Sequence, residues 1–500
     1  MQENTNKAIA FNSIVLYGKM VINTVCALLT TRFALIALGI VDFGLFSVLG
    51  GIISFISIFN TIMLSVSNRF IAVAIGKGDT EGANKQFNVN LVIHVLIALS
   101  VIVVAYPIGD WYIPRYVNYD GPLDNAMMVY LISIAGAVLS FVGVPYNGLL
   151  MAKERFLVFS LVDVFIHIIK LAVAWLLISF FEHKLLVYSL TMAFATAFPT
   201  LIYIAYCIKH FREVVRFKFV TERFMYKRVF SFSSWVAIGA VAQVGKIQGA
   251  ALVVNTFFNT VMNSAMGVAT SINSYVMLFS QSVTQPMQPQ LTKSYAAGNY
   301  DRTDELLIMS TKYSFLFAFL AGSVFLVAPE WLLGLWLEEV PQYASVFLVL
   351  FVIDSLIRSL NAGIANIIFA SGNISLFQII VSCLNIFSVI LGYIVLKLGA
   401  PAYFLVVAYI VVSIVMFFSI QYALHRTLDY DNSKLWKYSY LPSLTIVVLF
   451  IPIVILPISI SPLLKLVLSF AYLCVLEWYI GFTKTERTRI ITFIKQKINK

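Results

Sequence analysis

The sequence predicts an all-α polytopic membrane protein, and its composition and its pattern both carry this prediction. Hydrophobic residues make up 60% of the 500 positions, charged residues only 11%, and the mean hydropathy is +0.91. A soluble globular chain of ordinary composition has about 25% charged residues. Apolar runs of roughly 20 residues, long enough to cross a bilayer as helices, recur along the whole chain.

These runs predict about fourteen membrane-spanning helices, each bounded by polar or charged residues. We expect them at 9–30, 43–68, 88–109, 126–150, 156–181, 185–208, 229–253, 260–285, 307–328, 344–370, 376–396, 401–423, 439–458 and 462–483. The longest polar connector, "IKHFREVVRFKFVTERFMYKR", follows the sixth span and separates two lobes. The expected division is an N-lobe at 1–215, a C-lobe at 216–428, and a segment at 429–500 with two further spans and a basic tail.

The distribution of Lys and Arg predicts how these spans are oriented. With the N-terminus in the cytoplasm, 25 of the 34 basic residues fall in cytoplasmic segments, 5 in outward segments and 4 within spans. Cytoplasmic loops of membrane proteins carry such an excess of basic residues. The bias therefore predicts an even number of spans, with both termini in the cytoplasm.

Charge placement and cysteine spacing exclude several classes of function. The net charge of +11 lies in connecting loops and the C-terminal tail, which argues against a nucleic-acid partner. The cysteines are single and widely spaced, unlike a metal site or a disulfide framework. No ATP-binding motif, exposed pair of carboxylates or Ser–His arrangement is present. We therefore expect no cofactor, no bound metal and no enzyme activity.

An internal repeat relates the two lobes. The segment "SNRFIAVAIGKGDTEGANKQF" aligns with "LTKSYAAGNYDRTDELL" at a shift of 222, which pairs Gly76 with Gly298 and Asp79 with Asp301. Three further pairs follow in order at shifts of 219 to 222, namely Pro107 with Pro329, Trp111 with Trp331, and Asn147 with Asn366. An even number of spans in each half makes this a parallel repeat, related by an axis along the membrane normal.

The same repeat places a Gly-Lys pair inside the first helix of each lobe. Gly18-Lys19 in "IVLYGKMVINTV" corresponds to Gly245-Lys246 in "VAQVGKIQGA" at a shift of 227. A charge at the bilayer centre costs about 2.5–3.5 kcal/mol on insertion scales. Neither lysine has an acidic residue within a turn of its own helix, so each requires a cavity, a partner elsewhere or a route to the interface by snorkelling. We favour a shared cavity, where the positive charge would suit an anionic substrate.

The other charges within spans are two bases, Lys170 and Arg358, and three acids, Asp163, Asp354 and Glu477. Asp354 and Arg358 lie four residues apart on one helix face, so a structural ion pair is expected, with anion binding by Arg358 as the alternative. Asp163, His167 and Lys170 also share a face. There the alternatives are pairing within or between helices and a role in proton or ion coupling, for which Asp163, His167 and Asp354 are the candidates.

Several motifs resemble the multidrug/oligosaccharidyl-lipid/polysaccharide exporter superfamily. They are "TRFALIALGIVDFGLFSVLGG" after the first span, "SNRFIAVAIGKGD" at the end of the second, and its echo "YAAGNYD". The resemblance covers spans one to twelve and implies two six-helix lobes in a pseudo-twofold repeat around a central cavity. The Arg…Leu-Gly-x-x-Asp-Phe-Gly-Leu pattern and the two extra C-terminal spans are similar to the polysaccharide-flippase branch, that of O-antigen-type lipid-linked oligosaccharides.

This resemblance implies a flippase of a bacterial cytoplasmic (inner) membrane that moves a polyprenyl-pyrophosphate-linked oligosaccharide outward for cell-surface polysaccharide or lipopolysaccharide biosynthesis. Lys19, Lys246 and Arg358 would bind the head group. Expected partners are membrane lipids, a coupling H⁺ or Na⁺, and glycan-assembly machinery. The alternative is a cation-coupled multidrug antiporter, whose branch implies an acid in the first helix where this chain has Lys19. A membrane-bound glycan polymerase or ligase is disfavoured, because the longest outward loop is roughly 110–125.

Overall fold

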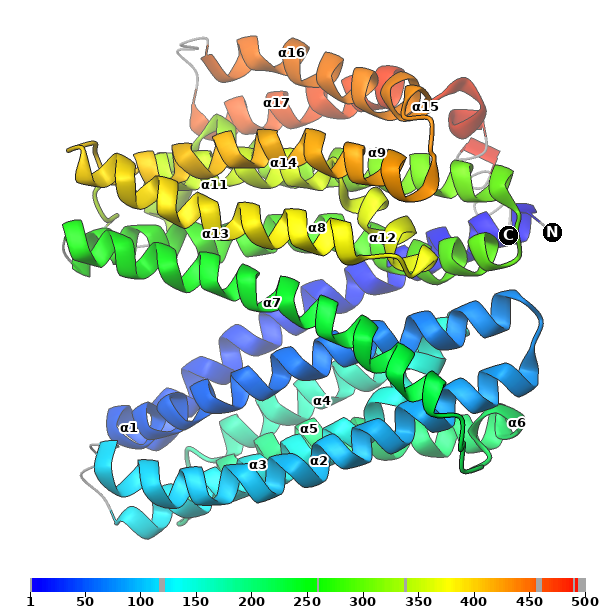
Figure 1. Cartoon of the computed structure of the whole chain (residues 1–500). Helices are drawn as coiled ribbons and strands as arrows, with labels where there is room; N and C mark the ends of the chain where they lie inside the picture. The colour runs from blue at the N-terminus through cyan, green and yellow to red at the C-terminus, as the bar shows by residue number, and fades with distance from the viewer. Residues whose placement is uncertain are drawn as a thin grey trace. The chain divides into compact units, whose positions relative to one another are not determined.

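The computed structural model describes residues 2–116, 122–258, 260–336, 340–455, 461–488 and 491–492. Within these ranges the regular secondary structure is helical, with no β-strand (Figure 1). Eleven helices are long and apolar enough to cross a membrane, or twelve if the bent pair α11–α12 counts as one span. The predicted all-α membrane class is confirmed, and the count of fourteen spans stays a prediction.

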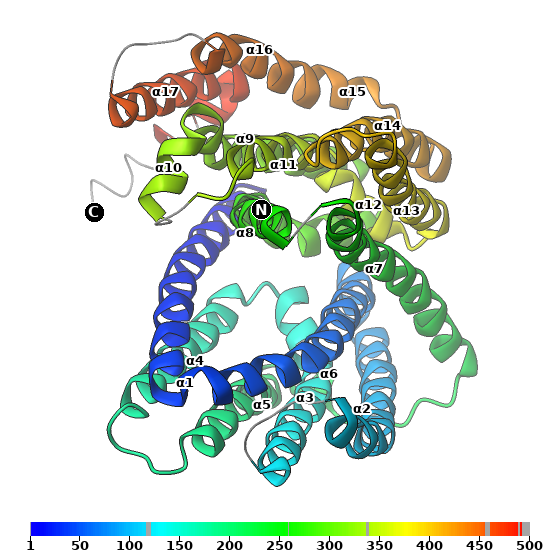
Figure 2. The ribbon, with the colours of Figure 1, turned by 90° about the vertical axis from the view of Figure 1, so that its left-hand side faces the viewer.

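The first predicted pair of spans forms one helical element, α1 (Gln2–Gly76), which breaks at Gly39. Gly39 has φ 74° and ψ 175°, a conformation that residues with a Cβ rarely adopt. The expected connector at 31–42 is therefore helical apart from this single break. Figure 2 shows the two arms of α1 diverging from it.

The chain divides into two compact units. Unit 1 comprises Met1–Ala237 together with Thr292–Gly298, and unit 2 comprises Ile238–Leu291 together with Asn299–Lys500. Two helices, α7 (Arg223–Phe257) and α8 (Thr260–Ala296), therefore contribute residues to both units.

Unit 1 is a bundle in which α3 packs against α1, α2 and α5, and α4 packs against α1 and α5. Its remaining helices are α2 (Thr80–Tyr116), α3 (Leu123–Ala152), α4 (Phe156–Leu176), α5 (Lys184–His210) and α6 (Arg212–Val215). The segment Thr292–Gly298 docks closely in this unit: a Cβ at Gly76 would lie 2.6 Å from the Lys293 backbone. The Lys293 ammonium also pairs with the Glu154 carboxylate.

Besides parts of α7 and α8, unit 2 contains the following helices, with η marking π-helix: α9 (Tyr300–Val327), α10 (Pro329–Trp336), α11 (Ala344–Ser359), α12 (Ala362–Ser371), α13 (Ser375–Lys397), α14 (Phe404–Leu428), α15 (Ser433–Leu435), η1 (Trp436–Tyr440), α16 (Leu441–Ile455), α17 (Pro462–Leu476) and η2 (Glu477–Gly481). Helix α9 packs against α11, α12 and α17, and α14 packs against α11, α12 and α13. The predicted span 344–370 is broken, because α11 and α12 meet at a 41° bend.

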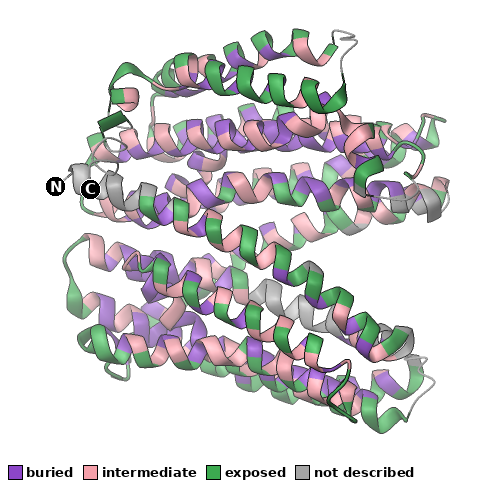
Figure 3. Cartoon of the chain, turned by 180° about the vertical axis from the view of Figure 1, so that it is seen from behind, coloured by how far each residue is buried: buried purple, intermediate pink, exposed green. Residues whose placement is uncertain are grey.

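The two C-terminal helices, α16 and α17, pack against the rest of unit 2 through α9. Phe450 of α16 contacts Phe319 of α9 edge to face, with ring centroids 5.3 Å apart. The buried Lys312 of α9 donates to Glu486, beyond η2, at 2.7 Å. Many exposed positions along the helices carry large apolar side chains, as expected for surfaces that face lipid (Figure 3).

One turn of the internal repeat has the same local geometry in both halves. Gly78 and Gly298 have φ of 71° and 72°, and the following Asp79 and Asn299 cap α2 and α9. Asp79 Oδ1 accepts from the Gly82 N–H at 2.7 Å, and Asn299 Oδ1 accepts from the Arg302 N–H at 3.1 Å. In the structure Gly78 therefore corresponds to Gly298, at a shift of 220. The sequence pairing of Gly76 with Gly298 is two residues out of register at this turn.

Candidate functional site

Unit 1 contains a charged group between the first arm of α1 and α4. We call it the Lys19 cluster and define it as Lys19, Asn23, Asp163, His167 and Lys170. Lys19 and Asn23 lie one helical turn apart on α1, and the other three share one face of α4. Asp163 is the centre, because every other member is directed at it or interacts with it electrostatically.

The Lys19 cluster is held by an ion pair and hydrogen bonds between helices. Lys19 Nζ lies 3.0 Å from Asp163 Oδ2, and Asn23 Nδ2 donates to the same oxygen at 2.8 Å. His167 Nδ1 is 2.8 Å from the Asp163 backbone carbonyl oxygen and 3.7 Å from carboxylate Oδ1. The Lys19 side chain is 17% exposed and that of Asp163 is 30% exposed, so this pair keeps access to its surroundings.

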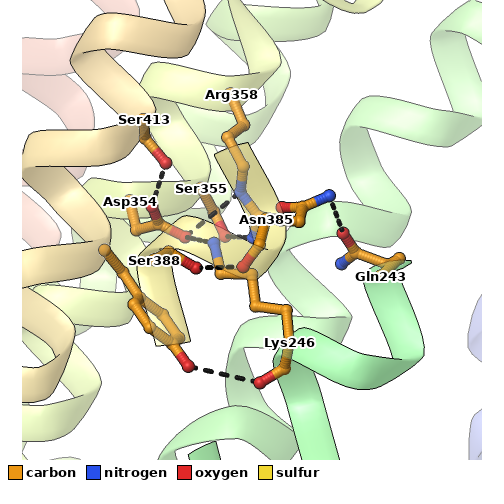
Figure 4. A network of polar contacts seen from close by, with 9 residues as sticks. Gln243, Lys246, Asp354, Ser355, Arg358, Asn385, Ser388 and Ser413 are labelled. Atoms are coloured by element: carbon orange, nitrogen blue, oxygen red, sulfur yellow. Dashed lines mark hydrogen bonds and ion pairs between the residues drawn. The ribbon is translucent and has the colours of Figure 1, made fainter. Parts of the chain in front are cut away.

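Unit 2 contains a second charged group, formed by α7, α11 and α14. We call it the Lys246 cluster and define it as Lys246, Asp354, Arg358, Tyr409 and Ser413 (Figure 4). Asp354 Oδ2 lies 3.9 Å from Lys246 Nζ and 3.1 Å from Arg358 Nε. Ser413 Oγ donates to Asp354 Oδ1 at 2.5 Å. The Lys246 and Asp354 side chains are 6% and 1% exposed, so this pair is almost entirely enclosed.

Polar contacts extend the Lys246 cluster. The Tyr409 hydroxyl donates to the Lys246 backbone carbonyl at 3.2 Å, and the Lys246 ammonium lies 4.4 Å from the Tyr409 ring centroid. On the neighbouring faces of α7 and α13, Asn385 Nδ2 donates to Gln243 Oε1 at 3.3 Å (Figure 4). The Arg358 Nε contact to Asp354 lacks hydrogen-bond geometry, and Arg358 Nη2 donates to Ser355 Oγ at 3.3 Å. Arg358 therefore holds Asp354 by an ion pair rather than by a directional hydrogen bond.

The structure brings the predicted site residues together within each unit. The expected pairing of Asp354 with Arg358 is confirmed, and Asp163 contacts His167 as well as two residues of another helix. Lys19 and Lys246 each have an aspartate partner, which comes from a different helix and so is invisible in the local sequence. That the two lysines line one cavity stays a prediction, as do the roles assigned to all six candidates.

Sequence reasoning missed several residues that complete the clusters. Asn385 stands at a shift of 222 from Asp163, so the repeat could have identified it as the counterpart of that acid. Phe159, whose ring centroid lies 4.1 Å from Lys19 Nζ, and Tyr409 are ordinary aromatic residues of apolar helices. Ser413 is likewise one of many hydroxyl residues within spans. No sequence signal distinguishes these three.

Each cluster contains two basic side chains and one carboxylate, which leaves one formal positive charge in excess. In unit 2 both bases lie within 4 Å of the acid, whereas in unit 1 Lys19 does so and Lys170 stands two turns along the same face of α4. In unit 1 the bases are Lys19 and Lys170, and in unit 2 they are Lys246 and Arg358. Charge-assisted hydrogen bonds to phosphate oxygens are the interaction that such groups make best. Among the described residues, no group of His, Cys, Asp and Glu is arranged to hold a metal ion.

No protein-family model and no curated protein matches this sequence. Solved structures match its fold. An outward-facing multidrug resistance MATE family transporter of the MOP superfamily aligns with a TM-score of 0.72 and 14% identity, over 84% of this chain and 96% of that chain. A MOP superfamily transporter from Pyrococcus furiosus gives 0.69 and 16%, over 84% and 96%. The Vibrio cholerae MATE transporter VcmN in the bent form gives 0.70 and 14%, over 86% and 99%. The superfamily resemblance predicted from the sequence is confirmed for the fold.

Proposed function

From the premise that the chain has the fold of the MATE transporters of the MOP superfamily, we propose that it is a flippase. It translocates a polyprenyl-pyrophosphate-linked oligosaccharide across the cytoplasmic membrane of a bacterium, for cell-surface polysaccharide biosynthesis. The observation that carries this proposal is the excess positive charge of the two clusters, each of which contains two bases and one acid within apolar helices.

The sign of this excess charge favours an anionic substrate. A pyrophosphate offers several acceptor oxygens to ammonium and guanidinium groups, whereas a cationic drug would be repelled by the same groups. The Arg358 side chain is 25% exposed, so its guanidinium can contribute positive charge toward such an acceptor although its Nε faces Asp354. Asn23, Gln243 and Asn385 provide neutral hydrogen-bonding groups of the kind that suits sugar hydroxyls.

We infer a mechanism of alternating access. The head group and glycan enter from the cytoplasmic side while the polyprenyl tail stays in lipid, and the lobes then open outward. Both termini lie in the cytoplasm in this scheme. The Pyrococcus furiosus transporter has a binding pocket of reverse polarity, which suggests a different function for that protein. A superfamily member with altered pocket charge is therefore consistent with our proposal.

Among the coupling candidates, geometry favours Asp163 over Asp354. Asp163 is partly exposed and contacts Lys19, Asn23 and His167, so a proton or Na⁺ can reach it. Asp354 is enclosed and is held by Arg358 and Ser413. We propose that Asp163, with His167, senses the coupling ion, and that Asp354 holds the Lys246 cluster together.

The test is glycan export in a strain lacking its own flippase, with protein level measured for each variant. Lys246→Gln is compared with Lys246→Gln/Asp354→Asn, because Asp354 has no proposed role in coupling. If Lys246 binds the substrate, the doubly neutral variant stays inactive although its folding recovers. If Lys246 only neutralises Asp354, export returns in the doubly neutral variant, and the anion-binding proposal is wrong. Lys19→Gln should also abolish export at an unchanged protein level.

The second candidate function is a cation-coupled multidrug antiporter, favoured by the structural likeness to multidrug MATE transporters. An antiporter would export cationic dyes from cells that express the wild-type chain. It would not restore glycan export in the flippase-deficient strain. Dye export without restored glycan export would therefore show that the chain is an antiporter and that the flippase proposal is wrong.

A further inference from the structure

The connector between α5 and α7 exposes an unusual combination of side chains. Arg216, Lys218 and Arg223 are exposed and alternate with three phenylalanines. Phe217, Phe219 and Phe224 are 63%, 66% and 66% exposed, although large apolar groups outside the membrane are normally covered. We call these six residues the connector surface. We propose that the connector surface binds the anionic phospholipid head groups of the adjacent bilayer leaflet.

The connector is held in one position by two asparagines of α2. Asn84 Nδ2 donates to three backbone carbonyls of the connector: Glu213 at 3.2 Å, Val214 at 2.9 Å and Arg216 at 2.7 Å. Asn88 Nδ2 donates to the Arg216 carbonyl at 3.1 Å, and Asn88 Oδ1 accepts from the Lys218 N–H at 3.3 Å. The clamp uses backbone atoms only, which leaves the Arg216 and Lys218 side chains free to point outward.

The clamp creates a groove of about 620 Å³ between the start of α2 and the connector. Arg216, Phe217 and Lys218 line it, together with Glu81 and Glu213. Glu81 is within 3.6 Å of Lys85 Nζ, and Lys85 also pairs with Glu222 at 3.3 Å. No ion pair of the Arg216 or Lys218 side chain occurs within the part of the chain that the structure describes. The groove thus combines two cationic groups and one exposed aromatic ring with two carboxylates, of which Glu81 pairs with Lys85.

The position of the connector identifies its partner. Its two ends continue into Lys184–His210 and Arg223–Val254, both long and apolar enough to span the membrane. Figure 1 shows α6 and the following loop beside one end of α2. A segment joining two spans lies at the level of the lipid head groups, where basic residues attract anionic lipids and aromatic residues act as anchors. This inference is independent of the transported substrate.

The test measures which lipids the protein retains. The full-length protein is placed in nanodiscs of equal phosphatidylglycerol and phosphatidylcholine, extracted gently, and its bound lipids are counted by native mass spectrometry. One juxtamembrane cation contributes a factor of about five in lipid affinity. We expect Arg216→Gln/Lys218→Gln to lower the retained phosphatidylglycerol-to-phosphatidylcholine ratio at least ~5-fold.

Arg216→Lys/Lys218→Arg keeps both cations at the same positions and serves as the matched control. It should leave the ratio within about twofold of wild type, since the charge of the connector surface is unchanged. An unchanged ratio in Arg216→Gln/Lys218→Gln would overturn the proposal. So would equal retention of phosphatidylcholine and phosphatidylglycerol by the wild-type protein, which would indicate a site for zwitterionic lipid.

A second measurement does not depend on the folding of the double variant. Phe217→Trp keeps an aromatic side chain at an exposed position, and its fluorescence is taken as the difference from wild type. Brominated phosphatidylglycerol should quench this signal more strongly than brominated phosphatidylcholine. Equal quenching would contradict selectivity for anionic lipid, and absence of quenching would place the connector away from the bilayer.

Discussion

The Lys19 and Lys246 clusters have the same charge count and differ in how they are enclosed. Lys19 and Asp163 are 17% and 30% exposed, whereas Lys246 and Asp354 are 6% and 1% exposed. Yet the ion-pair distance is shorter in the exposed cluster, at 3.0 Å against 3.9 Å. The ion pair with the shorter distance is therefore the more exposed of the two.

This difference separates two uses of a membrane-buried ion pair. In the Lys246 cluster, Ser413 and Arg358 complete the coordination of Asp354, so that removing Asp354 leaves two positive charges without their acid. In the Lys19 cluster, Asp163 remains accessible and can exchange partners at lower cost. We expect the enclosed cluster to govern stability and the accessible cluster to govern the transport cycle.

The largest expected effect is on stability, after removal of each aspartate. Asp354→Ala leaves the buried Lys246 and the partly buried Arg358 without their acid and should cost about 3–5 kcal/mol. Asp163→Ala should cost about 1 kcal/mol or less, as for partly exposed pairs. Thermal unfolding in detergent, followed by size-exclusion chromatography after heating, measures both. Asp110→Ala, at an exposed position of α2, is the control. Equal losses in the two variants would show that burial does not distinguish the clusters.

An intermediate effect is expected in double-mutant cycles of the two ion pairs. The cycle of Lys246→Gln with Asp354→Asn should give a coupling energy of about 1–3 kcal/mol, and that of Lys19→Gln with Asp163→Asn about 0.5 kcal/mol. The same unfolding measurement gives both values. If the order is reversed, contact distance rather than enclosure determines the strength of these pairs.

The smallest effect is expected from the aromatic residues beside the two lysines. Tyr409→Phe keeps the ring under Lys246 and removes the hydrogen bond to its carbonyl, which should cost about 1 kcal/mol. Phe159→Leu removes the ring beside Lys19 and should cost about 0.5–1 kcal/mol. Unfolding midpoints resolve these shifts only if protein levels are matched. A larger loss from Phe159→Leu than from Asp163→Ala would mean that packing, not charge, holds Lys19.

Apolar run length was sufficient to predict the fold class and the order of the helices. It failed where a helix is interrupted without a polar signal. The α11–α12 bend falls inside a predicted single span, whereas the break of α1 at Gly39 lies within the predicted connector at 31–42. Such breaks depend on one backbone conformation or on packing against neighbouring helices, so hydropathy does not detect them.

The charged residues of the candidate site could be predicted from the sequence, but only some of their interaction partners could. Asp354 and Arg358 share a helix face at a spacing of four, and the structure pairs them. The Lys19–Asp163 contact joins residues 144 positions apart in two helices, and no periodicity within either helix encodes it. Partners of this kind follow from helix packing, which a single sequence does not specify.

The docking of Thr292–Gly298 has a consequence for biosynthesis. Unit 1 is discontinuous, and the backbone of Lys293, which follows α7 and most of α8 in the chain, lies against Gly76. Translation adds about 5–20 residues per second. A nascent chain that has reached Ala237 therefore waits several seconds before this contact can form, and Glu154 lacks its Lys293 partner during that time. We expect unit 1 to be completed only after this wait, and a fragment ending before residue 298 should be a better substrate for membrane proteases than the full chain.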